Sequence, residues 1–287
     1  MPQFLTSEPA IRFMVFLTVF CVMAGLELVS PRLARPDMTG ALKMRRWFTN
    51  LSMVVLSTVL MRIVFPAAAV GTALYAESHG YGLFRHLAIP PVVGGILAFI
   101  ILDFAVWLEH VASHKIPLLW RIHRMHHADQ GFDLTTALRF HPLEILLSMV
   151  WKAAIILVLG PPVVAVLVFE IVLNATAMFN HANVRLPLGL DRVLRLFLVT
   201  PDMHRVHHST IQRETDSNYG FNLPVWDRLF GTYNDQPRMG HEGMKIGLDE
   251  FRSEATSRLG WSLVLPFRPA GYADSEQGID QKIPLGK

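Results

Sequence analysis

The segment that decides the fold is DFAVWLEHVASHKIPLLWRIHRMHH, residues 103–127. It continues an apolar run that begins near residue 88, and an apolar helix of ~20 residues is long enough to cross a bilayer. Its second half is rich in histidine. His110 and His114 are four residues apart, which on a helix places both imidazoles on one face. The segment therefore predicts a membrane helix that carries metal-ligating side chains at one end.

The rest of the chain repeats the apolar pattern. Of its 287 residues, 52% are hydrophobic and only 17% are charged, which is typical of a membrane protein. The sequence GPP at 160–162 predicts a tight hairpin between the last two runs. We predict an all-α fold, a polytopic membrane helical bundle of about four to five spans, from this run and four others at about 11–30, 51–76, 143–159 and 162–180.

The basic residues predict the orientation of the bundle. Loop 31–50 contains five arginines and lysines, whereas loop 77–87 contains one arginine. The positive-inside rule then places the histidine-rich segment 109–142 and the tail from 181 onward in the cytoplasm. We expect an integral membrane protein whose histidine site and C-terminus are cytoplasmic. The N-terminal apolar run lacks the flanks of a cleaved signal peptide and is expected to remain as an anchor.

Some polar features do not follow this simple pattern. Arg62 and Glu170 lie inside apolar runs, which indicates either a polar cavity or a segment that only dips into the bilayer. The polar tail after about 240 predicts a loosely ordered extension. The net charge of +3 comes from scattered residues and membrane flanks, so we exclude nucleic acid as a partner.

Two histidine triplets share the spacing HxxHH, which brings positions i, i+3 and i+4 together on a helix. Thr200 and Pro201 resemble a helix start directly before the second triplet. One metal rarely binds more than three or four histidines, so eight of them favour two metals. Cys21 is the sole cysteine, so any metal is held by nitrogen and oxygen. The eight candidates are His110, His114, His123, His126, His127, His204, His207 and His208.

Outside these boxes, fewer residues qualify. His141 and His181 stand alone in RFHPLE and FNHAN, where each is either a further ligand or a structural histidine. Asp103 precedes His110 by seven residues on the same helical face and is a candidate acceptor that orients a ligand. Glu170, Asn174 and His181 also share a stripe. For the eight boxed histidines, the alternative is a surface or pH-sensing cluster, and for Asp103 and Glu170 it is local pairing inside the membrane.

The chain resembles the fatty acid hydroxylase and sterol desaturase superfamily of membrane metal oxygenases. The resemblance rests on the order of the histidine motifs, which is HxxxH, HxxHH, a lone histidine and HxxHH. It also rests on their contexts, which include NHANV and PDMHRVHHS besides those quoted above. NYGFNLPVWDRLFGTY at 218–233 resembles the segment after the last histidine box of that family. The resemblance covers roughly residues 95–235. It implies N-terminal membrane helices at 1–94, a histidine-box domain at 95–235 and a polar tail at 236–287.

The same resemblance implies a cytoplasmic helical cap that holds two metal ions in an all-histidine site. The implied ligands are the eight boxed histidines and His181. Some members have an HxxxH pair in the middle region, but position 185 is Arg185 here, so a tenth ligand is missing or is His141.

The resemblance further implies two iron ions, with zinc an option in isolated protein, and O₂ as co-substrate. The reaction would be hydroxylation or desaturation of a lipid C–H bond. No nucleotide-binding fingerprint is present in the sequence, so electrons would come from an external ferredoxin or cytochrome with its reductase. Arg121, Arg124 and Arg205 are candidates for docking that donor or are solvated surface residues.

Three other functions are alternatives to oxidation of a membrane lipid. A carotenoid-ring hydroxylase also has several histidine boxes, but the segment at 218–233 argues against it. A membrane metal carrier or sensor would need polar residues throughout its spans, whereas these histidines gather at one face. A metal hydrolase would favour the HExxH signature, which is absent from the sequence.

Overall fold

The computed structural model describes residues 3–34, 40–269 and 271–273. Every regular element in these ranges is a helix, and the only β pairing is two isolated bridges, Pro31 with Val184 and Ser209 with Ile246. The predicted all-α class is confirmed for this part of the chain.

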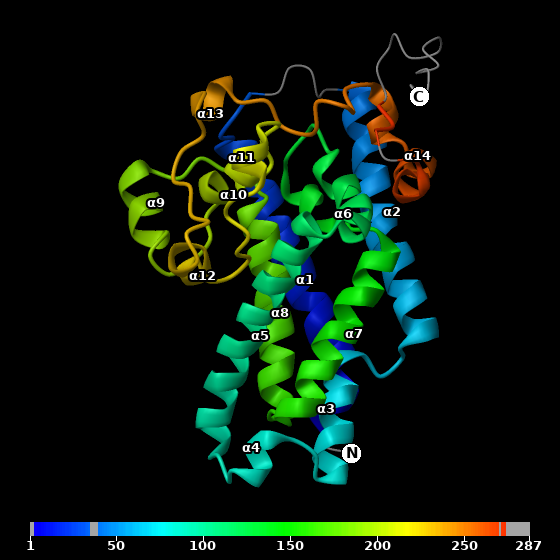
Figure 1. Ribbon diagram of the computed structural model, residues 1–287, viewed down its shortest axis with the longest axis vertical. Coiled ribbons are helices and arrows are strands. Elements are labelled where there is room, and N and C mark those ends of the chain that lie inside the picture. Colours follow the sequence, from blue (N-terminus) through cyan, green and yellow to red (C-terminus); the bar gives the residue numbers. More distant parts are fainter. Residues whose placement is uncertain (1–2, 35–39, 270, 274–287) are drawn as a thin grey trace, which may run out of the picture.

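Five long helices run side by side and form the bundle (Figure 1). Each is long and apolar enough to cross a membrane. Their outward faces carry large exposed apolar side chains such as Met14, Ile63, Ile96, Val150 and Val164, which suits contact with lipid. The bundle helices are α1 (Gln3–Val29), α2 (Gly40–Val64), α5 (Pro91–Lys115), α7 (Pro142–Leu159) and α8 (Val163–Asn180).

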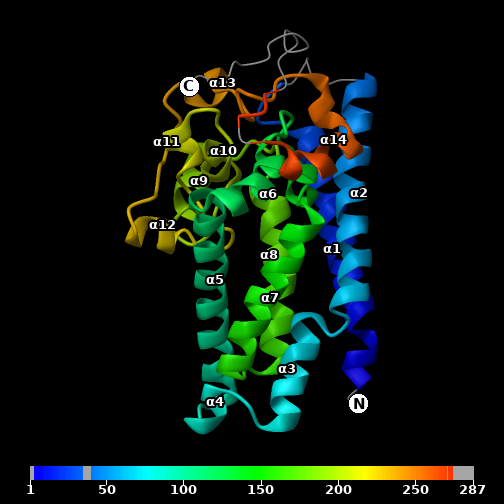
Figure 2. The ribbon, with the colours of Figure 1, turned by 45° about the vertical axis from the view of Figure 1, so that its right-hand side comes forward.

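The second apolar run is not one continuous helix. The structure divides it into α2 and the shorter α3 (Ala68–His79), which is followed by α4 (Leu83–His86). Pro66 explains the break, because proline has no N–H to donate and disfavours helical backbone in the residue before it. The predicted apolar run over 51–76 thus contains a helix break, although it lies within one candidate membrane span, Gly40–His86. Helices α3 and α4 lie at the end of the bundle opposite the cap (Figure 2).

Short helices gather as a cap over the other end of the bundle (Figures 1 and 2). Between them, the described loops fold back over the ends of α5 and α8. The cap elements are α6 (Pro117–His127), η1 (Leu134–Leu138), α9 (Leu188–Leu194), α10 (Pro201–His207), α11 (Gln212–Thr215), α12 (Val225–Leu229), α13 (Gly240–Gly243), η2 (Glu254–Ser257), α14 (Leu259–Val264) and η3 (Leu265–Phe267).

The expectation of a loosely ordered tail from about 240 is wrong for residues 240–267. Phe251 and Leu265 are fully buried and pack with Met53 of α2 and Met125 of α6 in one apolar cluster. Burying such side chains stabilises the folded state by roughly 1.5–3 kcal/mol each. The segment therefore fastens α6 to α2. Residues 274–287 of the predicted tail lie outside the described residues.

Candidate metal centre

Nine histidines meet where the bundle joins the cap. Their ring nitrogens form two groups, and within each group the candidate ligand atoms lie within 4.8 Å of one another. We call them the five-histidine group and the four-histidine group. The first contains His110, His114, His123, His127 and His207; the second contains His126, His181, His204 and His208.

The two HxxHH boxes are divided between the groups in opposite ways. In α6, His123 and His127 belong to the five-histidine group and His126 to the four-histidine group. In the α10 box, His204 belongs to the four-histidine group together with the neighbouring His208, whereas His207 belongs to the other. Residues i and i+4 thus share one group while i+3 reaches the second. Each box therefore links both groups.

Local sequence explains how these helices present the rings. Pro117 occupies the first turn of α6. Backbone N–H groups in the first turn form no hydrogen bond within the helix, so proline, which has no N–H, is tolerated there. Thr200 caps α10 as predicted, with its side chain accepting a hydrogen bond from the Met203 N–H at 3.4 Å. His181 lies directly after α8, at its C-cap.

The distances between ring nitrogens fit metal binding. Within the five-histidine group, Nε2 of His110 lies 3.0 Å from Nε2 of His207 and 3.2 Å from Nε2 of His123. In the four-histidine group, Nε2 of His181 lies 3.1 Å from that of His204 and 3.3 Å from that of His126. Nitrogens at ~2.1 Å from one shared ion are separated by about this much. The nitrogens converge on two centres.

Buried nitrogens without partners support the same interpretation. Both ring nitrogens of His208 and Nδ1 of His127 and His204 are buried and have no hydrogen-bond partner among the described residues. Such orphaned groups are rare in folded proteins and call for an explanation. The donor set therefore fits two metal ions.

Backbone and side-chain acceptors orient several of the rings. Nδ1 of His110 lies 2.7 Å from the Tyr219 carbonyl, and Nδ1 of His207 lies 2.7 Å from the Ser217 carbonyl. Nδ1 of His123 lies 2.6 Å from Oε1 of Glu144. A ring that donates from Nδ1 keeps the Nε2 lone pair free for a metal. Segment 217–219, which follows the last box, thus holds two rings.

Asp103 does not contact these rings. Its carboxylate accepts a hydrogen bond from Trp226 Nε1 at 2.8 Å instead. Although Asp103 and His110 share a helical face, seven residues separate them by ~10 Å along the axis. Glu144, at the start of α7, has the orienting contact that we expected of Asp103. No helical spacing relates Glu144 to His123, so the sequence carried no signal for this pair.

The lone histidines differ in position. His181 lies in the four-histidine group, whereas His141 lies outside both groups. Nδ1 of His141 accepts from the Leu143 N–H at 3.2 Å, which caps α7, and its Nε2 lies 3.2 Å from the Leu263 carbonyl. Both nitrogens of His141 are thus engaged with backbone. The four-histidine group has no tenth histidine near it among the described residues.

Burial favours the neutral form of five histidines at the cap end of the bundle. The pKa values of His126, His204 and His208 lie well below their ordinary value because burial penalises the charged form and neighbouring imidazoles add repulsion. The same causes, burial first, lower the pKa of His207 to about 3, and burial lowers the pKa of His181 to about 4. Neutral imidazole is the form that binds metal.

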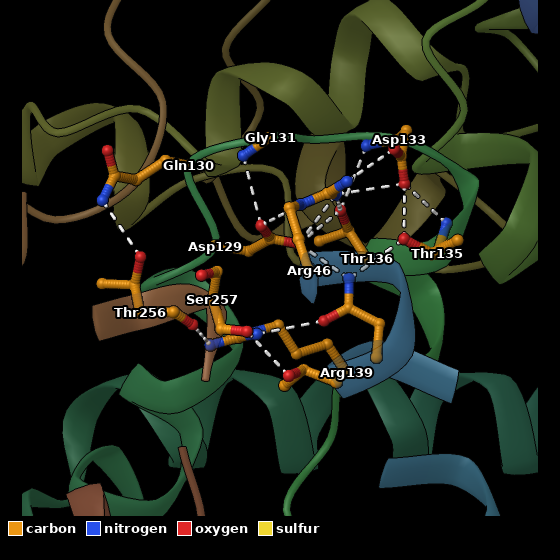
Figure 3. A network of polar contacts seen from close by, with 12 residues as sticks. Arg46, Asp129, Gln130, Gly131, Asp133, Thr135, Thr136, Arg139, Thr256 and Ser257 are labelled. Atoms are coloured by element: carbon orange, nitrogen blue, oxygen red, sulfur yellow. Dashed lines mark hydrogen bonds and ion pairs between the residues drawn. The ribbon is translucent and has the colours of Figure 1, made fainter. Parts of the chain in front are cut away.

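A buried ionic network supports α6 from the side of α2 (Figure 3). Arg46 donates to Asp129 at 2.9 Å and to Asp133 at 2.6 Å, and its own side chain is only 3% exposed. Burial alone would raise the pKa of Asp129, but Arg46 and Arg139 hold it well below its usual range. Arg139 also donates to the Met125 carbonyl at 3.0 Å. The network fixes the loop that directly follows His127.

The arginines expected to dock an electron donor have other roles. Arg124 is 5% exposed and donates to the Leu265 and Arg268 carbonyls, while Arg205 is fully buried and pairs with Asp202. Arg121 is partly exposed and donates to the Pro266 carbonyl. The expectation that Arg124 and Arg205 form a docking surface is wrong, because neither is accessible.

A cavity of about 1150 Å³ leads through the bundle to the five-histidine group. It lies among α1, α2, α3, α5, α7 and α8, and His110 and His123 line it. Most of its wall is apolar, as suits a lipid. Glu170 and Asn174 of the predicted stripe also line it, but His181 does not.

Comparison with known proteins agrees with this geometry. Residues 95–232 match the fatty acid hydroxylase family. The chain is 32% identical over 236 residues to the ornithine lipid hydroxylase OlsE of Rhizobium tropici. The aligned region covers 78% of this chain and 67% of that protein. It is 35% identical over 137 residues to human alkylglycerol monooxygenase, covering 47% of this chain but only 29% of that protein.

A fungal relative extends the comparison. The fatty acid hydroxylase vlmA of a Lecanicillium species is 32% identical over 165 residues, which covers 48% of this chain and 40% of that protein. No solved structure is significantly similar to the chain. Ordered histidine boxes, a membrane bundle and these relatives lead to one conclusion: the chain belongs to the fatty acid hydroxylase family.

Proposed function

We propose that this integral membrane protein uses O₂ and external electrons to hydroxylate a C–H bond of a membrane lipid at a di-iron centre. The observation that carries the proposal is the pair of buried histidine groups at the end of a largely apolar cavity. Relatives named as lipid hydroxylases and monooxygenases support it. Hydroxylation is favoured over desaturation because these relatives are named for insertion of oxygen.

Iron fits the reaction better than zinc. When bound, two iron ions supply the reduction of O₂ that oxidation of an unactivated C–H bond requires, whereas zinc has no redox chemistry. In the overall reaction a C–H bond breaks and a C–O bond forms. The second oxygen atom leaves as water, with two protons and two electrons consumed. The electrons come from a separate protein of the ferredoxin or cytochrome class.

The residues of the chain hold the site and keep water away from it. The nine imidazoles would bind the ions, and the carbonyls of residues 217 and 219 together with Glu144 orient three of the rings. Phe140 stacks on His126 with ring centres 4.3 Å apart, and Phe221 lies 4.9 Å from His110. Both phenylalanines line the cavity, so they exclude water from the reacting end.

The cavity also determines which group the substrate approaches. His110 and His123 line it, and both belong to the five-histidine group. A lipid in the cavity therefore reaches that group first. The four-histidine group is buried behind it, against Phe132, whose ring centre lies 5.0 Å from that of His208.

The orientation and the division of the chain belong to the same proposal. The cap lies in the cytoplasm, because the described basic residues of segment 31–50 lie at the cap end of the bundle, with Lys43, Arg45 and Arg46 in the first turns of α2. Residues 1–94 supply membrane helices, 95–235 supply the histidine-box domain, and 236–287 form a C-terminal segment. A cytoplasmic donor protein would then have direct access to the cap.

Incorporation of isotopically labelled O₂ tests the proposed function. The purified protein, reconstituted with membrane lipids, a ferredoxin or cytochrome donor and its reductase, should yield lipids that contain one labelled oxygen atom. A His126→Ala variant should yield none. Labelled water in place of labelled O₂ should also yield none. Unchanged lipids with iron-loaded protein and active donors would contradict the proposal.

A further inference from the structure

Two short helices of the cap, α9 and α12, carry apolar side chains on the outside of the protein. A helix at a water-facing surface normally turns its apolar residues toward the core. A contiguous apolar patch on a surface indicates contact with a partner or a membrane. We use the name α9–α12 surface for six side chains that are 44–75% exposed: Leu188, Val193, Phe197, Val225, Leu229 and Phe230.

The acidic side chains of the same two helices point inward. Asp191 of α9 is buried and pairs with Arg195 at 2.6 Å. Asp227 of α12 is fully buried and accepts a hydrogen bond from the Trp107 Nε1–H at 3.0 Å. Apolar side chains outside and carboxylates inside are the arrangement expected of a surface that lies against lipid, because lipid offers charged groups no hydrogen bonds.

Helix α12 lies beside the membrane span α5 and not on top of the cap (Figures 1 and 2). Trp226 donates to Asp103 of α5 at 2.8 Å, and the ring centre of Phe230 lies 4.8 Å from that of Trp107. Asp103 and Trp107 precede Lys115, the last residue of α5, by about 18 and 12 Å along the helix axis. Helix α12 therefore lies at a depth that the span itself occupies.

The exposed apolar face of α5 continues on both sides of this contact. Ile100 and Leu108 lie one helical turn before and after Phe104, and each is 40% exposed. Phe104 contacts Trp226 of α12, with ring centres 4.9 Å apart. Because Pro91–Lys115 is a candidate membrane span, lipid that covers Ile100 and Leu108 also reaches α12. The α9–α12 surface is thus continuous with the lipid-facing surface of the bundle.

Arginine and aromatic side chains border the α9–α12 surface. The guanidinium of Arg228 lies 4.0 Å from the ring centre of Tyr233. Arg228 also donates to the Arg195 carbonyl at 3.0 Å, which joins α12 to the end of α9. Arg192 of α9 is exposed as well. Such residues are typical of the level of lipid headgroups, where aromatic rings gather and cations pair with phosphate.

We propose that α9 and α12 lie in the headgroup region of the bilayer, with the α9–α12 surface against the acyl chains. Helix α12 reaches deeper, and α9 lies nearer the cap (Figures 1 and 2). Arg192 and Arg228 contact lipid phosphates. One side of the cap is thus immersed in one leaflet. This inference concerns the position of the chain in the membrane and does not rest on the proposed function.

Lipid contact at α12 also bears on the candidate metal centre. Asp227 accepts hydrogen bonds from the N–H groups of Tyr219 and Gly220, at 2.9 and 2.8 Å. The Tyr219 carbonyl in turn lies 2.7 Å from Nδ1 of His110. Helix α12 is therefore held by lipid on one side and by the segment that orients His110 on the other.

The accessibility of attached fluorophores tests the proposal in nanodiscs that each hold one full-length chain. Phe197→Cys and Leu229→Cys, each in a Cys21→Ser background, provide single labelling sites. Lipids with brominated acyl chains should quench both probes, as they quench a probe at Ile96→Cys on the outward face of α5. Iodide should quench both at least about tenfold more slowly than a probe at Met239→Cys in the cap, because a charged ion does not enter the apolar region.

Either of two other results would overturn the proposal. Iodide quenching of the Leu229→Cys probe as fast as that of the Met239→Cys probe would place the α9–α12 surface in water. Protection of the Leu229→Cys probe from both quenchers would show that protein covers this surface in place of lipid. A second copy of the chain is absent from each nanodisc, so it cannot mimic the effect of lipid.

A charge substitution provides a test without a label. Leu229→Asp places a carboxylate against acyl chains and should lower the melting temperature in nanodiscs by about 2–8 °C, because lipid disfavours charged side chains. Met239→Asp is the matched control, since Leu229 and Met239 are 67% and 61% exposed. It should melt near the parent. Equal melting temperatures for the two variants would contradict the contact of α12 with lipid.

Discussion

The buried ionic network around Arg46 offers a sharp test of how the cap holds the histidines. Arg46→Met removes a guanidinium that pairs with Asp129 and Asp133 in a nearly solvent-free position. Two carboxylates are then left buried without their main cation. Breaking a buried pair by removing one partner typically costs about 3–5 kcal/mol. The loop that follows His127 should loosen in consequence.

The expected shift is large enough to measure. At about 2–4 °C per kcal/mol for a chain of this size, the melting temperature should fall by roughly 6–20 °C. Thermal unfolding of the purified protein in detergent, followed by tryptophan fluorescence, measures it. The matched control is Arg45→Met on the same helix, where the side chains of Arg45 and its partner Glu254 are 36% and 67% exposed. Exposed pairs contribute about 0–1 kcal/mol, so this variant should melt near the parent.

Two further variants decide the cause. Replacing Asp129 and Asp133 by asparagine in the Arg46→Met background should recover part of the lost stability, because the unpaired charges are gone. Equal melting temperatures for Arg46→Met and Arg45→Met would refute the reasoning. A further fall in the melting temperature when Asp129 and Asp133 are replaced in the Arg46→Met background would refute it as well.

Other predictions concern single side chains. Glu144→Gln should weaken metal binding by about 10–100-fold, because its carboxylate orients His123, and competition with a chelator measures the change. His141→Asn should keep the full metal content, since His141 lies outside both groups; loss of an ion by elemental analysis would contradict that position. Burial lowers the pKa of His241 to about 4, so below pH ~6.5 the unfolded state binds a proton that the folded state does not. The melting temperature of His241→Asn minus that of the parent should therefore increase as the pH falls from 6.5 to 4. A difference in melting temperature that does not depend on pH would argue against a buried neutral ring.

Much of the site follows from local sequence, because its elements are helical. The spacing HxxHH fixes which rings share a helix face, and Thr200 with Pro201 marks the start of α10 as predicted. The apolar runs predicted the bundle for the same reason, since a helix in lipid needs only length and apolar side chains. Pro66 was present in the sequence, and its effect on the second run could have been predicted.

The remaining features depend on tertiary contacts that no spacing encodes. The way α6 and α10 cross places His126 of α6 with the four-histidine group and His207 of α10 with the five-histidine group. The contact of Glu144 with His123 likewise depends on how α7 packs against α6. Phe251 lies in a polar stretch, so its burial against α2 could not be predicted from the composition around it. Local patterns predict helices and faces, but the pairing of faces is a property of the whole fold.

The most direct test of the central claim is the metal content per chain, measured by elemental mass spectrometry on the detergent-purified protein. We predict two iron ions in the parent. A His126→Ala, His207→Ala double variant removes one ligand from each group and should lose most of both ions. A parent that binds no metal, or a single ion, would contradict the dinuclear centre. Two zinc ions that iron cannot replace would contradict its role in O₂ chemistry.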